Sequence, residues 1–199
     1  TTNDIRRALI MVVRSMIELD PAYSKVAARL LLDKIYNDVF GYDLEYSNLV
    51  ELHRKIFARN IDNAIKDGLL DPRMAEFDIE TLSKSFILDN DRLFEYMGLE
   101  TQKPIETPQM FGMRIAMETA LIEKESEKPK VAAEFYDVLS NFYYTPGGRT
   151  LFQAGAIKAQ LSNCFLNVVP DSLDSIFKSF SDNAQYLKWS GGTGTSWTP

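Results

Sequence analysis

The chain has 199 residues, of which 22 are Lys or Arg and 28 are Asp or Glu, giving a formal charge of −6. Hydrophobic residues make up 45% of it, which excludes a disordered or collagen-like protein because enough apolar side chains are present to fill a core. The acidic balance argues against nucleic-acid binding, and no apolar run is long enough to cross a membrane. The single cysteine allows no internal disulfide, so we expect a globular protein of the reducing cytoplasm.

The first two-thirds of the chain is predicted to be helical, because apolar side chains recur there at the spacing of one helix face. Asp20-Pro21, Gly41 and Gly68 mark breaks between helices. Helices are expected over residues 2–19, 21–41, 44–66, 79–86 and 91–96. The side chains expected to point inward are Ile5, Leu9, Val12, Met16, Leu19, Ala27, Leu30, Leu31, Ile35, Leu49, Leu52, Ile56 and Ile61.

A new helix is predicted after the Pro-containing stretch at 103–108. Thr107 is expected to cap it, and Pro108 to occupy the first helical position, where a missing backbone N–H costs nothing. A further helix follows and ends at a turn over 145–148. The buried stripes expected on the two helices are Met110, Met113, Met117 and Leu121, then Val131, Phe135, Val138, Leu139 and Phe142.

The last forty residues are predicted to form a strand and a helix. The strand lies within 161–169, where consecutive apolar residues are typical of a strand covered on both faces. The helix runs to about Trp189, and Gly191–Gly194 ends it. Its expected inward stripe is Leu173, Ile176, Phe177, Phe180, Ala184 and Leu187. One strand and one helix do not make a sheet, so we expect further chain to complete this fold.

Cys164 has two interpretations. A lone cysteine in an apolar strand is most often a small buried hydrophobe. The polar Ser162-Asn163 before it place the thiol near the start of the strand, where a redox thiol beside a cleft is the competing interpretation. Spacing alone favours the buried hydrophobe.

The segment Asp171-Ser172-Leu173-Asp174 opens the last helix directly after the strand. Asp171 suits the N-cap, and Asp174 falls in the first turn, where the helix dipole favours negative charge. The competing interpretation is an acceptor for ribose hydroxyls, since ligands of α/β folds bind at the carboxyl ends of strands. The residues by themselves favour the cap.

Two glycine-rich segments remain. Gly191–Gly194 follows a helix and has no Lys-Ser or Lys-Thr after it, so it is neither a phosphate-binding loop nor a dinucleotide motif. Its first glycine suits a helix C-cap, and its three glycines indicate a loop or ligand close to the backbone. Gly147–Thr150 is a turn by default, with an Arg and a hydroxyl that suit a phosphate or substrate. His53 is interpreted as an ordinary helix residue, and neither a metal site nor a catalytic triad is predicted.

Several segments in this order resemble the large (α) subunit of ribonucleotide reductase over nearly the whole chain. They are residues 1–5, 20–23, 27–30, 105–109, 113–117, 161–166, 171–176 and 188–194. The resemblance implies a mainly α fold, with a helical N-terminal domain over 1–158 and the first strand-helix unit of an incomplete ten-stranded α/β barrel over 159–199. It also implies radical reduction of ribonucleotides to deoxyribonucleotides, which serves DNA replication.

The resemblance further implies roles for individual residues. Cys164 falls on one of the two cysteines that reduce the ribose and close a disulfide in each turnover. Substrate contacts are implied at Thr150, Ser162, Asn163 and Gly192. An allosteric specificity site for an effector deoxynucleotide is implied at Asp171, Ser172, Leu173 and Lys188. Gly191–Gly194 would begin the flexible loop that links effector and substrate.

The implied cofactors and partners lie outside this segment, which is expected to bind no cofactor itself. The radical comes from a metal-containing small subunit or from adenosylcobalamin, and the residues leave both open, as they do a diphosphate or triphosphate substrate. Thioredoxin or glutaredoxin is implied as reductant, and deoxynucleotides or ATP as effectors. The implied protein partners are the C-terminal remainder of the subunit and a second α subunit, packed through the helix at 172–188.

Two functions are therefore considered. In the first, the chain is the N-terminal part of a reductase α subunit, is inactive without the remainder, and exposes apolar surface on the strand around Cys164 and on the last helix. In the alternative, it is a non-catalytic helical assembly module that retains reductase-like motifs only for packing. A stand-alone thiol oxidoreductase ranks below both, because the chain has no second cysteine.

Overall fold

The computed structural model describes residues 1–41, 46–84 and 106–197. The described chain is mainly helical, with a small sheet of two parallel strands. It divides into two compact units, Thr1–Thr145 and Pro146–Pro199. The domain boundary expected at 158/159 stays a prediction. Within the described residues, none of the helices has the length and apolar character that crossing a bilayer requires.

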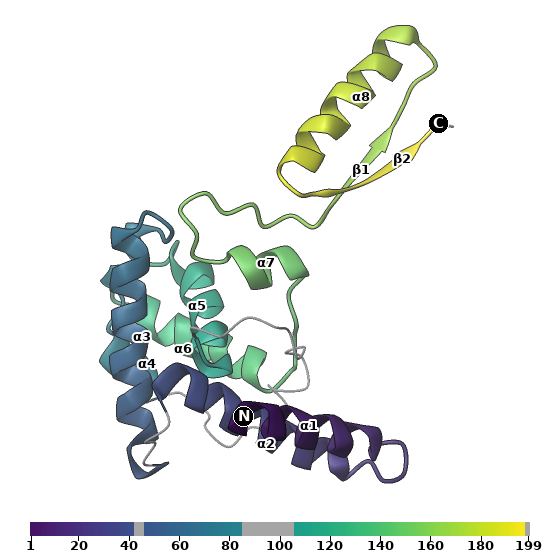
Figure 1. Ribbon diagram of the computed structural model, residues 1–199. Coiled ribbons are helices and arrows are strands. Elements are labelled where there is room, and N and C mark those ends of the chain that lie inside the picture. Colours follow the sequence, from purple (N-terminus) through teal and green to yellow (C-terminus); the bar gives the residue numbers. More distant parts are fainter. Residues whose placement is uncertain (42–45, 85–105, 198–199) are drawn as a thin grey trace. The chain divides into compact units, whose positions relative to one another are not determined.

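The first unit is built from helices (Figure 1). In chain order these are α1 (Thr2–Ser15), α2 (Tyr23–Phe40), the 3-10 helix η1 (Tyr46–Asn48), α3 (Leu49–Lys66), the 3-10 helix η2 (Pro72–Glu76), α4 (Ile79–Ser83), α5 (Pro108–Ala120) and α6 (Lys128–Ser140). The helix expected over 91–96, and the ends of those expected over 44–66 and 79–86, fall at least partly outside the described residues. α3 itself starts at Leu49.

α1 starts with a reciprocal cap and turns only one edge toward α2. The Thr1 hydroxyl accepts the Asp4 backbone N–H, and the Asp4 carboxylate accepts from the Thr1 amine and hydroxyl. Ile10 and Val13 are buried. The expected inward stripe is wrong here, because four of its five members, Ile5, Leu9, Val12 and Leu19, are exposed.

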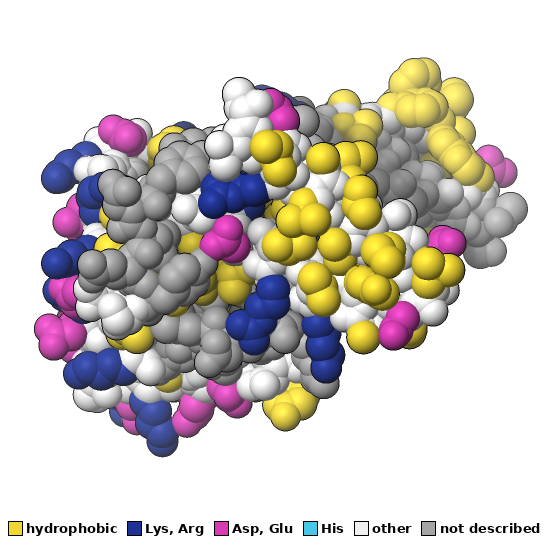
Figure 2. All heavy atoms as spheres, turned by 60° about the horizontal axis from the view of Figure 1, so that its bottom comes forward, with side chains coloured by type: hydrophobic (Ala, Val, Ile, Leu, Met, Phe, Trp, Pro, Cys, Tyr) yellow, Lys and Arg dark blue, Asp and Glu magenta, His cyan; other side chains and the backbone are white. Residues whose placement is uncertain are grey.

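The reason for this difference is the width of the apolar surface of α1. Ile5, Leu9, Met11 and Val12 stay exposed beside the buried Ile10 and Val13, so the apolar surface of α1 is wider than its one neighbouring helix buries. Figure 2 brings forward the side of the molecule that carries α1 and α2, and hydrophobic side chains gather on it. The apolar stripe predicted from the sequence is therefore present on α1, but most of its side chains lie on the surface and not in the core.

α2 and α3 bury a polar group that the sequence did not predict. His53 is fully buried, and its Nδ1 lies 2.7 Å from the carbonyl oxygen of Leu49. Its ring meets those of Tyr36 and Phe40 edge-on, with centroids 5.3 and 4.8 Å away. Among the other expected inward side chains, Ala27, Ile35, Leu49 and Ile61 are buried, while Leu30, Leu31, Leu52 and Ile56 are half-buried.

α5 contributes more buried residues than any other helix that the structure describes. The Thr107 side chain accepts from the Met110 N–H, and Pro108 is the first helical residue, which confirms the predicted cap. The expected stripe is also confirmed, since all four of its members are buried: Met110, Met113, Met117 and Leu121.

α6 packs on α5 through a face shifted from the expected one. It buries Ala132 and Tyr136, whereas Phe135 stays 39% exposed. The Tyr136 ring lies so close to α5 that a Cβ on Gly112 would stand 3.3 Å from it. Gly112 lets the two helices approach closely at Tyr136, and the bulky Phe135 lies outside this contact. Val131 and Leu139 pack partly buried against the core.

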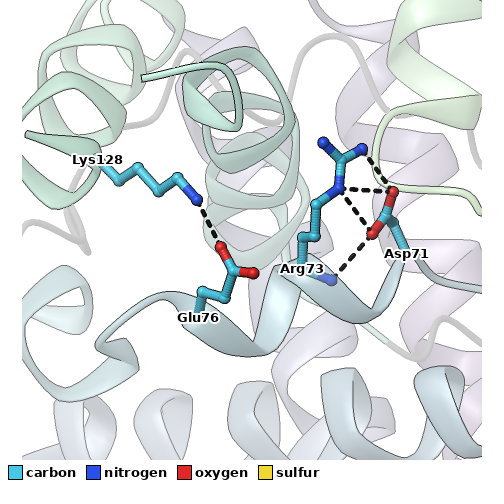
Figure 3. Close-up of polar contacts among 4 residues, drawn as sticks. All are labelled: Asp71, Arg73, Glu76 and Lys128. Carbon is cyan, nitrogen blue, oxygen red and sulfur yellow. Dashed lines mark hydrogen bonds and ion pairs between the residues drawn. The ribbon is translucent and has the colours of Figure 1, made fainter. Parts of the chain in front are cut away.

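Two ion pairs fix η2 at the edge of this core (Figure 3). Arg73 and Asp71 pair within the turn that starts η2, and the Asp71 carboxylate also accepts the Arg73 backbone N–H at 2.9 Å. The Lys128 ammonium reaches Glu76 from the first position of α6. One ion pair therefore stabilises the start of η2, and the other connects η2 to α6.

The second unit is a β-α-β unit preceded by a short helix. Its elements are α7 (Gly148–Gln153), β1 (Cys164–Val168), α8 (Leu173–Lys188) and β2 (Gly192–Ser196). The strands pair in parallel, with Cys164 opposite Gly192 and Val168 opposite Ser196. Both α7 and β2 correct expectations, since the sequence predicted a turn and a loop at these positions. β2 could not be predicted from side-chain alternation, because Gly192 and Gly194 contribute no side chains to the pattern.

α8 joins the sheet largely through polar contacts. Asn167 Nδ2 donates to Ser179 Oγ, and Asn183 Nδ2 donates to Thr195 Oγ1, each at 3.2 Å. Phe165 stacks on Tyr186 with ring centroids 4.4 Å apart. The contacts between α8 and the sheet thus combine two polar pairs with one aromatic stack.

The apolar side chains of the second unit point outward. Leu166 and Val168 of β1 are 88% and 58% exposed. On α8, the exposed fractions lie between 55% and 73% for Leu173, Phe177, Phe180 and Leu187. The expected inward stripe of α8 is therefore wrong except for half-buried Ile176, and β1 is covered on one face only. The expected exposure of apolar surface on the strand and last helix is confirmed.

Candidate functional site

Cys164 is an exposed free thiol at the first position of β1. Side chains alternate along a strand, and Phe165 and Asn167 contact α8, so Cys164 lies on the opposite, open face of the sheet. A Cβ on Gly192 would stand 3.7 Å from the Cys164 sulfur. The bare backbone there leaves space beside the thiol. The interpretation of Cys164 as a buried hydrophobe is wrong.

Asn163 connects the approach to Cys164 with two other segments. Its Oδ1 accepts the Arg149 backbone N–H at 2.8 Å, in the first turn of α7. Its carbonyl oxygen accepts the Gly192 N–H, also at 2.8 Å, at the start of β2. α7, β1 and β2 therefore meet at this residue.

Thr150 and Ser162 belong to the same group of contacts. Thr150 Oγ1 donates to the Leu161 carbonyl at 3.3 Å. Gln160 holds the Ser162 backbone on both sides, because its side chain accepts the Ser162 N–H and donates to the Ser162 carbonyl. The four residues expected to contact substrate therefore lie in hydrogen-bonded stretches of chain next to Cys164. They are Thr150, Ser162, Asn163 and Gly192.

The expected effector residues are divided between the two ends of α8. Ser172, rather than Asp171, caps the helix, since its side chain accepts the Ser175 N–H. Asp171 and Leu173 flank this cap and are exposed, and Asp174 lies in the first turn as expected. Lys188 is the last residue of α8, about 22 Å away at the rise of a helix. A single chain therefore does not bring Lys188 to the other three.

The first glycine after α8 has a role other than the expected cap. The residue with positive φ is Ser190, at 60°. A Cβ on Gly191 would lie 2.4 Å from the Phe165 ring, so this position must be glycine to admit the stacked Phe165 and Tyr186. The close approach inferred from the glycines is confirmed, but the chain's own side chains make it.

The chemistry available at this site is that of one accessible thiol. Such a thiol can attack or pair with a second sulfur, which a chain with one cysteine does not supply. In the described parts of the chain, no three His, Cys, Asp or Glu side chains gather as a metal-ligand set.

Sequence analysis missed Gly147 as a residue of the site. A Cβ there would stand 1.5 Å from Asn163 Nδ2, so glycine is required for the Asn163 side chain to reach α7. The Gly147-Gly148 pair was a visible signal, but it equally suits an ordinary turn.

Comparison with known proteins adds a family. Residues 93–158 match the family described as "Ribonucleotide reductase, all-alpha domain". The chain is 38% identical to the "Ribonucleoside-diphosphate reductase subunit alpha" of Chlamydia pneumoniae and 35% identical to that of Helicobacter pylori, in each case over 98% of its length. It covers 20% and 25% of those proteins. It is also 29% identical to the "Ribonucleoside-diphosphate reductase large subunit" of Acanthamoeba polyphaga mimivirus, of which it covers 23%.

Proposed function

We propose that this chain contributes the first redox thiol and the effector-binding helix of a ribonucleotide reductase large subunit. The chain belongs to that family and corresponds to its N-terminal region. It spans about a fifth to a quarter of the length of the curated relatives it matches. The complete activity in this proposal therefore requires the C-terminal remainder of the subunit.

The observation that carries the proposal is the exposure of Cys164 beside Gly192. A structural cysteine would be expected inside the core. Here the sulfur lies on an open sheet face, next to backbone without side chains and to the segment that holds Asn163. An exposed sulfur in this position is accessible to a substrate and to a second thiol.

The redox balance explains why two thiols are needed. Replacing a ribose C–OH by C–H consumes two electrons and two protons and releases water. Two thiols that close a disulfide give up two electrons and two protons, so Cys164 with one partner cysteine from the remainder balances the step. Thioredoxin or glutaredoxin would then reopen the disulfide. The radical that starts the reaction would come from a metal-containing small subunit or from adenosylcobalamin, outside the described residues.

Substrate binding is assigned in this proposal to the segment around Cys164. Thr150, Ser162 and Gly192 would contact the ribonucleotide, which is a diphosphate in the printed names of the relatives, and Asn163 lies among them. A reducing compartment such as the cytoplasm suits a site that depends on free thiols.

The β-α-β unit supports a larger assembly. Leu166 and Val168 leave one sheet face exposed, which suits packing against the rest of the proposed ten-stranded barrel. Phe177 and Phe180 leave the outer face of α8 uncovered, which suits packing against the same helix of a second α subunit. Burying both faces would remove these apolar side chains from water.

Allosteric control follows from the same assembly. Asp171, Ser172 and Leu173 stand at the start of α8 and Lys188 at its end. Antiparallel packing of two α8 helices would bring Lys188 of one subunit toward Asp171 of the other. An effector deoxynucleotide or ATP bound there would contact both chains, so its binding would depend on formation of the dimer.

The central experiment is reconstitution with the C-terminal remainder, a radical source of each kind and thioredoxin. Deoxynucleotide formation is measured with diphosphate and triphosphate substrates. Cys164→Ser is expected to form no product above background, whereas Asn63→Ala, on an exposed position of α3, is expected to behave as wild type. Product formation by Cys164→Ser at the wild-type rate contradicts the proposal.

The alternative, a helical assembly module, is favoured by the extent of exposed apolar surface on α1 and α8. Titration of deoxynucleoside triphosphates separates the two functions. The proposed enzyme should bind effector in the reconstituted dimer, and Asp171→Ala should weaken that binding. A module that serves only assembly should show no nucleotide dependence in either form.

A further inference from the structure

One residue, Asn163, holds the backbone before Cys164 from two directions. Its side-chain Oδ1 accepts the Arg149 N–H and its carbonyl accepts the Gly192 N–H, both at 2.8 Å. Both hydrogen bonds are made to backbone groups of other elements, α7 and β2. The position of Cys164 relative to these elements therefore depends on its immediate neighbour.

Gly147 provides the space for this contact. Gly147 is the N-cap residue of α7 and has no side chain with which to cap the helix. The Asn163 amide takes that part, because its oxygen accepts the N–H of the second helical residue, as an N-cap side chain does. A Cβ at 147 would stand 1.5 Å from Asn163 Nδ2, so only glycine leaves the amide in place.

We propose that Asn163 is a positioning residue for the Cys164 thiol, an inference that rests on the redox function proposed above. The side chain fixes the segment to α7, and the carbonyl fixes it to β2. Together they hold the sulfur beside Gly192. This role differs from the substrate contact implied by the family resemblance, because the Asn163 side-chain oxygen already accepts a hydrogen bond within the chain.

The proposed chemistry makes the position of the sulfur matter. A disulfide closes only when the two Cβ atoms are about 3.5–4.5 Å apart, and a reacting group that is displaced by about 1 Å loses much of its rate. If the Cys164 side chain were mobile, substrate would still bind through the other residues of the site. It would be poorly placed for the reduction itself, so the loss should appear in kcat.

The first test measures the order of the thiol directly in the full chain. The single cysteine accepts one nitroxide label, whose rotational mobility is read by electron paramagnetic resonance. Asn163→Ala is expected to shorten the rotational correlation time by about a factor of three. Asn163→Asp should restore it, because the carboxylate still accepts the Arg149 N–H, and Asn63→Ala should leave it unchanged. Unchanged mobility in Asn163→Ala overturns the proposal.

A double-mutant cycle tests the part played by Gly147. Gly147→Ala alone should also mobilise the label, because its Cβ displaces the amide of Asn163. Added to Asn163→Ala, it should have almost no further effect, since the group it collides with is gone. Fully additive effects would show that the two residues act separately, and would overturn the coupling.

Kinetics in the reconstituted reductase distinguish positioning from substrate contact. Asn163→Ala should lower kcat by about tenfold and leave KM within about twofold of wild type. A raised KM with unchanged kcat would make Asn163 a substrate contact and overturn the positioning role. If Cys164→Ser still reduced nucleotides, the proposed function would fall, whereas the label measurement needs no turnover and would still decide the role of Asn163.

Discussion

Lys128, at the first position of α6, forms an ion pair with Glu76 at the end of η2, 52 residues earlier in the chain. Figure 3 shows this pair. The lysine side chain is only 9% exposed and the glutamate 40%, so the cation is nearly buried while its partner reaches solvent. An unpaired cation at that depth is costly, because water no longer solvates it. The pair is therefore asymmetric in its consequences.

Removing the partner should cost more than removing the charge. Glu76→Gln leaves Lys128 unpaired and is expected to lower the free energy of unfolding by about 1–2 kcal/mol, between typical surface and buried pairs. Lys128→Met removes charge and need for a partner together, and should cost less. Urea unfolding measures both. A larger loss in Lys128→Met than in Glu76→Gln would contradict this ordering.

His53 should make the first unit sensitive to acid. Burial lowers its pKa from the ordinary value of 6.5, opposed by contacts with the Leu49 carbonyl and Gln109. The unfolded chain then binds a proton near pH 6.5 that the folded chain does not, so stability falls as pH drops below 6.5 and is unaffected above it. The slope is at most about 1.4 kcal/mol per pH unit.

The measurement for His53 is thermal unfolding between pH 5 and 8. His53→Phe, which keeps an aromatic ring beside Tyr36 and Phe40, should flatten the curve between pH 5 and 6.5. The Glu51 carboxyl, whose pKa the hydrogen bond from Arg54 lowers to about 2, titrates below this window and serves as the internal contrast. An unchanged slope in His53→Phe would assign the acid sensitivity elsewhere.

Thr107 should contribute through its hydroxyl. Thr107→Ala removes the acceptor for the Met110 N–H at the buried start of α5, and is expected to cost about 1 kcal/mol of unfolding free energy. Thr107→Ser keeps the acceptor and should lose clearly less. Equal losses in the two variants, measured by urea unfolding, would mean that the methyl group rather than the cap stabilises α5.

Gly191→Ala should disturb the aromatic stack of the second unit. The added Cβ would lie 2.4 Å from the Phe165 ring and force it off Tyr186, at an expected cost of roughly 1–3 kcal/mol. Near-ultraviolet circular dichroism reports the lost stack. Gly148→Ala is the matched control, because its Cβ meets only Phe152, at 4.0 Å. Comparable spectral changes in both variants would argue against the steric cause.

The outer face of α8 should drive association of the isolated chain. Phe177→Lys and Phe180→Lys place charges on that face and should reduce self-association, as followed by sedimentation velocity over a range of concentrations. Gln185→Lys, on an exposed position of the same helix, adds a like charge without removing apolar surface and should have little effect. Association that persists in both phenylalanine variants would direct attention to α1 instead.

Elements closed by local chemistry were predictable from the sequence. Thr107-Pro108 is a local sequence signal for the start of α5. The methionine stripe of α5 lies in the core because neighbouring helices surround it. The existence of α1 and α8 was equally clear from helical spacing. The direction in which they face was not, because an apolar stripe indicates burial somewhere without naming the partner.

The misplaced parts of the candidate site have a common physical cause. β2 carries Gly192 and Gly194, so its pairing depends on backbone hydrogen bonds that leave no mark in side-chain periodicity. The hydrogen bond from Arg149 to Asn163 joins residues 14 apart and depends on an absent side chain at Gly147. Cys164 itself was visible, but its exposure depends on which sheet face α8 covers.

The β-α-β unit joins α8 to its sheet through two hydrogen bonds between amides and hydroxyls and one aromatic stack, while leucine and phenylalanine side chains lie exposed on its surface. In the proposed subunit, where further strands and helices follow, such a unit would leave the ribosome with its apolar surfaces exposed and available for packing against those strands. The same surfaces would attract unrelated chains if those strands were delayed. In that proposal, prompt folding of the remainder, rather than the strength of the unit's own contacts, would decide whether the unit assembles or aggregates.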